Sequence, residues 1–477
     1  MADDQNQNPQ RAEVRPLGDT EDNWCRAVST GTGITVLALQ VGKPPNISHL
    51  QKVLHKLQNT HPILRSNLSY NPSTDSFSFV TPTTQHLQLN SITLAPTSPL
   101  LRINSLCPLR VILEEELNNA TWRNARSFSS AGVPVFFATV YELPDTKWVL
   151  TLRLHTAACD RTTAVGLLRE LREMMGAGGE TQKGIDEKRK GLNLGIEALI
   201  PSGGAKKSVW AHGLDVLSYS VSSLRLTNLK FRDVRGARRS EVVRLQMSPH
   251  DTDQIMQGCK LRGIQLCGVL AAAGILAAHS TKHLSDNRKK KYGVVTLTDC
   301  RPDLDPPLSS HHFGFYNSAI LNVHDVRRGE RLWDLARRSY EAFANSKKSN
   351  KHFTDMADLN FLMHRAIQNP SLTSSSSLRT SLITVFEEPV IDNSGETKLE
   401  VGLEDYMGCA SVHGVGPSMA IFDTVRDGRL DCACVYPSPL HTREQMQELV
   451  DNMKRILIGV SLGPSFFPPY WWDQIYK

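Results

Sequence analysis

The sequence predicts an α/β protein built as two lobes. Patterns typical of strands alternate with patterns typical of helices along both halves of the 477-residue chain. Each half is too large for one supersecondary unit and has enough apolar segments for its own core. We assign the chain to a disordered N-terminus, an N-terminal lobe, a crossover linker and a C-terminal lobe, with the boundaries 1–12, 13–180, 181–235 and 236–477.

The composition is that of an ordinary globular protein and argues against several functional classes. A net charge of +6 is mild for this length, and no basic stripe carries interleaved aromatic residues, so we do not expect a nucleic-acid partner. The first residues lack the apolar region of a signal peptide, and no apolar run is long enough to span a bilayer. Nine cysteines without paired spacing indicate reduced thiols and no zinc site. We therefore expect a cytoplasmic monomer without membrane contact or bound metal.

The first half begins with a predicted strand at Ile34–Val41 and a helix after Ser48, which can cap it. Leu50, Val53, Leu54 and Leu57 form one apolar face of that helix. Further segments follow, and we predict strands at 76–80, 134–143 and 147–155, with helices at 111–125 and from about Thr162. The last strand alternates apolar and polar residues up to His155, as expected for a strand.

The second half opens with a predicted strand at Val242–Met247 and contains a helix, Leu266–His279, that is apolar nearly all round and should be buried. Strands are predicted at 293–298, 313–323 and 380–386, and a hairpin joins 418–424 to 429–436 through Asp427-Gly428. Thr442 has the spacing to cap the last helix. The aromatic tail 466–472 is expected to pack on its own lobe.

The informative feature of the sequence is a strand, the segment His155-Thr156-Ala157-Ala158-Cys159-Asp160, and then a helix. Side chains at a strand end that leads into a helix are commonly functional. An imidazole with a pKa near neutrality suits a general base. A carboxylate nearby can hold a ring or a loop in place, so His155 and Asp160 are candidate catalytic residues.

This segment resembles the His-His-x-x-x-Asp-Gly motif of chloramphenicol acetyltransferase and of nonribosomal peptide condensation domains, and the His-x-x-x-Asp motif of plant BAHD acyltransferases. Other segments agree in their order along the chain: His61-Pro62-Ile63-Leu64-Arg65, Ile196–Pro201, Cys267–Ala278 and Thr298–Pro302 followed by Phe313-Gly314. The resemblance to the CoA-dependent acyltransferase superfamily covers nearly the whole chain, and the condensation and polyketide-associated branch is the most similar.

The resemblance implies two chloramphenicol-acetyltransferase-like lobes, each a mixed sheet flanked by helices, with a tunnel between them. It implies a role in specialised metabolism, in which an acyl group moves from an acyl-CoA co-substrate to a hydroxyl or amine of a small-molecule acceptor. No tightly bound cofactor is implied. A His in the tunnel takes the acceptor proton, and the Asp is a structural brace that pairs with an Arg of the second lobe, here Arg301.

The sequence departs from the family pattern at the position of the base. The family's catalytic His stands four residues before the Asp, and here that residue is Thr156; the Gly after the Asp is Arg161. The BAHD motif Asp-Phe-Gly-Trp-Gly is absent. Neighbouring residues of a strand point to opposite faces, so either the loop is re-registered to bring His155 into the tunnel, or Thr156 occupies the tunnel and the usual base is missing.

Several readings therefore stay open. His155 is a general base or a buried His that supports the loop. Cys159 is a thioester nucleophile or a packed apolar residue. Ser381, Thr384 and His413 line the tunnel or are ordinary strand and turn residues. The chain as a whole is an acyltransferase, a non-catalytic binding protein, or a repurposed member that performs condensation or cyclisation without CoA.

Overall fold

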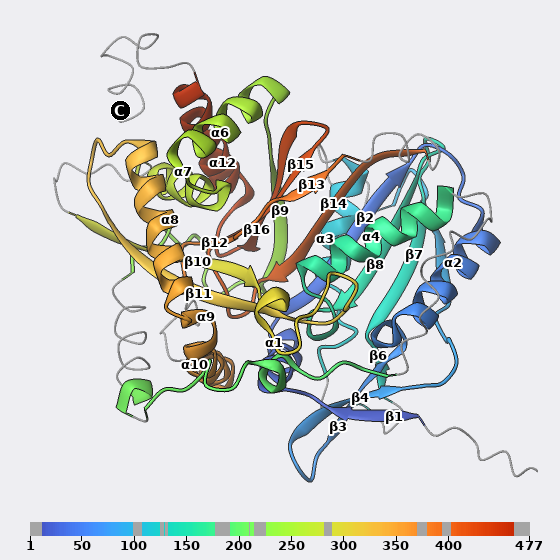
Figure 1. Ribbon diagram of the computed structural model, residues 1–477. Coiled ribbons are helices and arrows are strands. Elements are labelled where there is room, and N and C mark those ends of the chain that lie inside the picture. Colours follow the sequence, from blue (N-terminus) through green and yellow to red (C-terminus); the bar gives the residue numbers. More distant parts are fainter. Residues whose placement is uncertain are drawn as a thin grey trace, which may run out of the picture.

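The structure is a computed structural model that describes residues 12–98, 107–124, 128, 132–176, 191–208, 210–213, 226–280, 289–369, 379–393 and 402–461. Two lobes lie side by side, and each is a mixed sheet with helices packed against it (Figure 1). This confirms the predicted fold class. The predicted tail at 466–472, nearly all of the predicted disordered terminus and parts of the predicted linker lie outside the described residues.

The first lobe is built on a five-stranded sheet whose order is β14-β2-β8-β7-β5. Its interior strand β2, between β14 and β8, is buried along nearly its whole length, as expected for a strand covered on both faces. The strands and helices of this lobe are β2 (Thr32–Val41), β5 (Leu89–Thr93), β7 (Phe136–Glu142), β8 (Trp148–His155), α1 (Asp19–Val28), α2 (Ile47–Thr60), α3 (Pro108–Leu117), α4 (Arg161–Gly176) and the 3-10 turns η1 (Pro62–Arg65) and η3 (Thr156–Ala158). A small antiparallel sheet below it contains β1 (Glu13–Pro16), β4 (Ser76–Thr81), β3 (Asn67–Asn71) and β6 (Val133–Pro134).

One strand of the first lobe comes from far along the chain. Strand β14, Leu403–Val412, pairs antiparallel with β2 and so extends the first sheet. The sequence-based boundaries place these residues in the C-terminal lobe with the rest of 236–477, whereas the structure pairs them with β2 of the first lobe. Local patterns reveal that a segment is a strand, but not which sheet it joins.

The second lobe is built on a seven-stranded sheet of order β11-β10-β12-β15-β16-β9, with β13 beside β15. Helix α7 lies in its core, and 14 of its residues, Leu266 to His279, are buried, as its uniform apolarity predicts. The elements are β9 (Arg239–Gln246), β10 (Lys290–Asp299), β11 (Asn317–Val326), β12 (Ile383–Phe386), β13 (Val390–Asp392), β15 (Met419–Arg426), β16 (Arg429–Ser438), α6 (Pro249–Arg262), α7 (Leu266–Ser280), α8 (Leu332–Lys348), α9 (Lys351–Thr354), α10 (Met356–Gln368), α12 (Arg443–Ser461) and the 3-10 turns η4 (Ile196–Leu199) and η5 (Arg301–Asp303).

Local signals account for several boundaries. Helix α2 buries the predicted apolar face, but its cap is Asn46, whose side chain accepts from the amide of His49, and not Ser48. The turn between β15 and β16 has positive φ at both Asp427 and Gly428, the conformation that a two-residue hairpin requires. The Thr442 hydroxyl accepts from the amide of Gln445 at the start of α12.

In the part of the chain that the structure describes, no single helix is long and apolar enough to cross a membrane. Helices α6 and α7 satisfy that test of length and composition only as a pair, with a bend of 111° between them.

Candidate functional site

A cavity of about 1110 Å³ lies between the two lobes. Its walls come from α4, β2 and β14 of the first lobe and from β10, β11, β12 and β15 of the second, with further residues of α1 and α10. Many of the lining side chains are apolar, among them Leu37, Leu168, Leu297, Phe315 and Phe422. Small-molecule sites typically enclose about 300–1,000 Å³, so the cavity has room for a large apolar ligand.

The motif segment is held between a central strand and a long helix. His155 is the last residue of β8, opposite Ile34 of β2, and its amide donates to the carbonyl of Val135. The 3-10 turn η3 follows at once, and α4 begins at Arg161. The loop thus leaves the sheet in one short turn, and the direction of each side chain is fixed by the strand before it.

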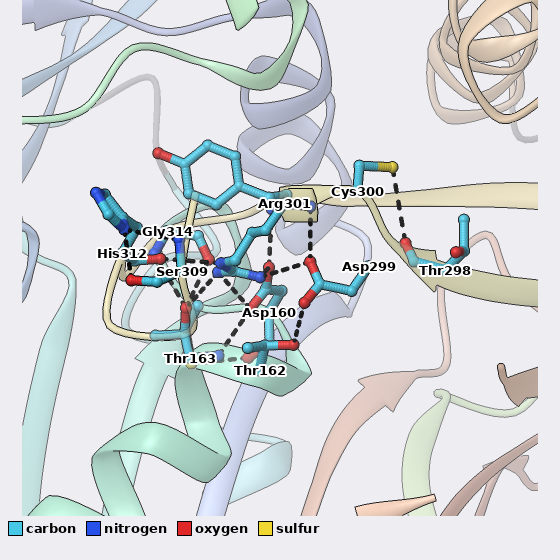
Figure 2. Close-up of polar contacts among 12 residues, drawn as sticks. Asp160, Thr162, Thr163, Thr298, Asp299, Cys300, Arg301, Ser309, His312 and Gly314 are labelled. Carbon is cyan, nitrogen blue, oxygen red and sulfur yellow. Dashed lines mark hydrogen bonds and ion pairs between the residues drawn. The ribbon is translucent and has the colours of Figure 1, made fainter. Parts of the chain in front are cut away.

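Asp160 is fully enclosed and fully hydrogen-bonded (Figure 2). Its Oδ1 accepts from the amide of Thr163 at 2.8 Å, which caps the first turn of α4, and its Oδ2 accepts from the amide of Tyr316 at 2.8 Å. Arg301 pairs with both oxygens, at 2.8 Å to Oδ2 and 3.1 Å to Oδ1. The carboxylate therefore fastens α4 of the first lobe to the 301–316 segment of the second.

Arg301 is equally well satisfied on its own side of the pair. Its Nε donates to the carbonyl of His312 at 3.1 Å, and its terminal nitrogens also reach Asp299 at 2.9 Å and Thr163 at 3.1 Å. Burial alone would lower the pKa of this guanidinium, but the charges of Asp160 and Asp299 outweigh burial and raise it. The predicted pairing of Asp160 with Arg301 is present, and its geometry is that of a structural brace.

His155 lies outside the cavity. Its ring is buried, meets Trp122 edge to face with centroids 5.3 Å apart, and accepts through Nδ1 from the amide of Ala157 at 3.2 Å. Its Nε2 has no hydrogen-bond partner among the described residues. Burial lowers the pKa of His155 to about 3, so the ring is neutral. His155 is not among the residues that line the cavity. In this arrangement its imidazole cannot reach a ligand in the cavity to act as a base.

Thr156 faces the cavity, at the position where the resembled family has its base. Its hydroxyl lies 2.9 Å from that of Thr35, which also lines the cavity. The change of face between His155 and Thr156 follows the alternation of the strand that they leave. No histidine is among the described residues that line the cavity.

The other residues singled out in the sequence fall into two groups. Thr384 and Cys159 line the cavity, whereas Ser381 and His413 do not. Burial raises the pKa of the Cys159 thiol well above its usual value, which opposes a thiolate nucleophile. Ser381 is buried within 3.5 Å of the Thr384 hydroxyl.

His413 also has a structural environment. Its Nδ1 lies 3.0 Å from the hydroxyl of Ser240, and burial, together with nearby arginines, lowers its pKa to about 4. The predicted absence of metal remains a prediction, and among the described residues no cluster of His, Cys, Asp or Glu has the arrangement to hold an ion.

Arg161, which replaces the Gly of the family motif, lines the cavity. It forms an ion pair with Asp423 of β15 at 2.9 Å and lies over the ring of Phe386, with its carbon 4.2 Å from the ring centre. Complete burial raises the pKa of Asp423, an effect that Arg161 partly opposes. Arg161 thus forms a second charged link between the lobes.

A third link involves residues that the sequence alone did not single out. Arg172 of α4 pairs with Asp392 of β13 at 3.3 Å, and the hydroxyl of Tyr406 of β14 donates to Asp392 at 2.6 Å. All three line the cavity. Helical spacing could have indicated Arg172, because it lies on the same face of α4 as Arg161, Ala164 and Leu168. Its partner is 220 residues away, which no local pattern reveals.

The early His-Pro segment contributes a further contact between the lobes. His61 lies 2.7 Å from Glu170 of α4 and stacks on Phe313 of the second lobe with ring centroids 3.6 Å apart. Burial would raise the pKa of Glu170, but hydrogen bonds with His61 and His311 lower it. The role of this segment in the structure is therefore to join α4 to the loop that also holds Arg301.

Comparison with known proteins places the fold. No family model and no curated protein sequence matches the chain. The trichothecene 15-O-acetyltransferase from Fusarium sporotrichioides is similar in structure, with 12% identity, a TM-score of 0.68 and 94% of this chain and 95% of that one covered. A cyclization-docking bidomain from Sorangium cellulosum has 14% identity and a TM-score of 0.66, with 95% and 85% covered. The condensation domain of the monacolin K polyketide synthase has 10% identity and a TM-score of 0.62, with 95% and 99% covered.

Proposed function

We propose, from the fold that this chain shares with condensation domains and CoA-dependent acyltransferases, that it binds a large apolar small molecule between its lobes and uses no imidazole base there. The observation that carries the proposal is the orientation of two neighbours: Thr156 faces the cavity and His155 faces away from it. The chain is on this view a repurposed member of the fold. The structural neighbours bear names of an acetyltransferase, a cyclization domain and a condensation domain, and a fold by itself does not decide among such activities.

The chemistry of the lining supports binding rather than base catalysis. A threonine hydroxyl cannot replace an imidazole as a proton acceptor near neutral pH, and loss of a general base typically costs about 10²- to 10⁴-fold in rate. The size and apolar lining of the cavity are unaffected by that loss. What the cavity retains is the capacity to enclose and orient a ligand, whether for binding alone or for a condensation or cyclisation that orientation promotes.

Binding is tested with Nile red, a neutral apolar fluorophore whose emission rises in an apolar site. We expect saturable uptake by the wild type and weaker uptake by Ala319→Phe, which adds an aromatic ring to the cavity wall on β11. Val323→Phe is the matched control, because Val323 is on the same strand, 42% exposed, and outside the lining. Equal uptake by the two variants would place the fluorophore elsewhere and contradict the proposal.

A second candidate is acyl transfer from an acyl-CoA co-substrate to a hydroxyl or amine of a small acceptor. The specific observation that favours it is the intact pair of Asp160 and Arg301, which holds the motif loop at the cavity wall. The partners would be the thioester donor and the small acceptor, and the chain would act as a cytoplasmic monomer.

The two candidates are separated by mass spectrometry of acyl-CoA donors mixed with alcohol and amine acceptors. The binding proposal expects no acceptor-dependent product from the wild type, and a gain of about 10²-fold or more over background in Thr156→His, which puts an imidazole at the cavity wall. Product formed by the wild type and lost in a folded His155→Ala variant would support acyl transfer with His155 as the base.

A further inference from the structure

The ion pair of Arg172 and Asp392 has unused hydrogen-bonding capacity at the cavity wall. Three nitrogen–oxygen contacts join the two side chains, and all three are long for an ion pair, at 3.3–3.4 Å. The Nε of Arg172 has no hydrogen-bond partner among the described residues. Both side chains are nearly enclosed, at 7% and 8% exposure. A buried guanidinium held this loosely gains energy from any further acceptor that reaches it.

Tyr406 fixes the carboxylate side of this cluster. Its hydroxyl donates to Asp392 at 2.6 Å, and its ring is held from behind by Arg426, whose guanidinium carbon is 4.6 Å from the ring centre. Asp392 is therefore anchored, and Arg172 is the member with room to adjust. The three side chains come from α4, β14 and β13, so the cluster joins both lobes at the cavity wall.

Positive and negative side chains near this cluster are equal in number, and this balance favours a ligand group without a net charge. Arg169 and Glu173 are exposed neighbours on α4 that also line the cavity, and they offset one another as Arg172 and Asp392 do. A ligand carboxylate would meet the charge of Asp392 and would have to be desolvated against it. A hydroxyl can accept from Arg172 and donate to Asp392 without adding charge.

We infer that Arg172, Asp392 and Tyr406 form a recognition site for a neutral hydroxyl at one end of an otherwise apolar ligand. This rests on the proposed function, which it deepens by naming the ligand class: a long or polycyclic apolar alcohol. Arg172 is eleven residues along α4 from Arg161, so the site lies on the order of 16 Å of helical rise from the motif loop. A ligand held here by its hydroxyl lays its apolar body along α4 toward Thr156.

The test uses three probes of one chain length: 1-tetradecanol, tetradecanoic acid and methyl tetradecyl ether, each displacing Nile red. The wild type is expected to bind the alcohol about tenfold more tightly than the ether, as one hydrogen bond to a charged group allows, and more tightly than the acid. Asp392→Ala is expected to abolish the preference for the alcohol over the ether, because both probes can accept from Arg172 and only the alcohol can donate to Asp392. Asp334→Ala is the matched control, because Asp334 is an exposed carboxylate of α8 outside the cavity lining, and this variant should keep the preference.

The outcomes separate this inference from the proposed function. Nile red uptake with no preference among the probes, or with a preference for the acid, would overturn the hydroxyl site and leave the apolar binding site standing. No uptake of Nile red or of any probe by folded wild type would overturn both. Should Asp392→Ala fail to fold, Tyr406→Phe asks the same question, because it removes the hydroxyl that positions Asp392 and is expected to weaken selection of the alcohol.

Discussion

Helix α4 has a carboxylate–guanidinium pair at each end, and the two pairs differ in how completely they are satisfied. Asp160, just before the helix, is 0% exposed and meets Arg301 at 2.8 Å, with backbone amides completing its hydrogen bonds. Arg172, near the far end, meets Asp392 at 3.3 Å, and its Nε has no hydrogen-bond partner in the part of the chain that the structure describes. A saturated pair, in which every donor and acceptor already has a partner, has no hydrogen-bonding group available to a ligand and serves as a brace. An unsaturated pair at the wall of a cavity is suited to recognition.

The largest expected effect is at the saturated pair. Asp160→Ala leaves Arg301 buried without its main counter-charge and removes the acceptor for the amides of Thr163 and Tyr316. We expect the free energy of unfolding to fall by roughly 3–5 kcal/mol, as when one partner of a buried ion pair is removed. Chemical denaturation measures it. A loss below about 1 kcal/mol would show that the pair is no brace and would remove the contrast between the two ends.

His155 belongs to the same well-packed end, and its truncation is the next largest change. His155→Ala opens a hole beside Trp122 and leaves the amide of Ala157 without its acceptor. We expect a loss of about 2–4 kcal/mol in the free energy of unfolding. Nile red uptake by the folded fraction should be unchanged. A variant of undiminished stability that no longer transfers acyl groups would instead establish the imidazole as the base.

The burial of His155 at this end of α4 also makes the stability of the protein sensitive to acid. The folded state keeps the pKa of His155 at about 3, because the ring is buried, whereas the unfolded chain takes up a proton near pH 6.5. Stability from this group is complete above pH 6.5 and is lost as the pH falls from 6.5 toward 3, by about 1.4 kcal/mol for each pH unit. Between pH 6.5 and 5 this amounts to about 2 kcal/mol.

The variant His155→Asn isolates this contribution, since the amide oxygen of Asn can still accept from Ala157. Denaturation at pH 5, 6 and 7 should show a dependence on pH smaller by one proton than in the wild type. Other buried imidazoles, His324, His413 and His441, have pKa values lowered by burial in the same way and keep the rest of the acid sensitivity. An identical slope in the variant would mean that His155 is already protonated in the fold.

The sequence predicts one end of α4 far better than the other. The strand, the loop and the helix follow from periodicity, and Arg301 follows from a resemblance whose motifs lie in a fixed order. Periodicity does not determine which face of the sheet the His155 side chain lies on. A shift of one residue at the end of the strand moves each side chain to the opposite face. Local sequence patterns do not predict the site at Arg172. It depends on β14, which crosses into the first sheet, and on Asp392 in a short strand of the second.

The smallest expected effect is at the unsaturated pair, and it decides whether the contrast is real. Asp392→Ala removes contacts that are already long, and Arg172 lies on the wall of a roomy cavity that water can enter. We therefore expect a smaller loss than for Asp160→Ala, of about 1–2 kcal/mol in the free energy of unfolding, because water in the cavity can reach the uncovered guanidinium. Denaturation beside Asp160→Ala measures it. The same variant should lose its preference for tetradecanol over the methyl ether. If Asp392→Ala destabilises the protein as much as Asp160→Ala does, both pairs are structural braces. The inference that Arg172 and Asp392 recognise a hydroxyl would then be wrong.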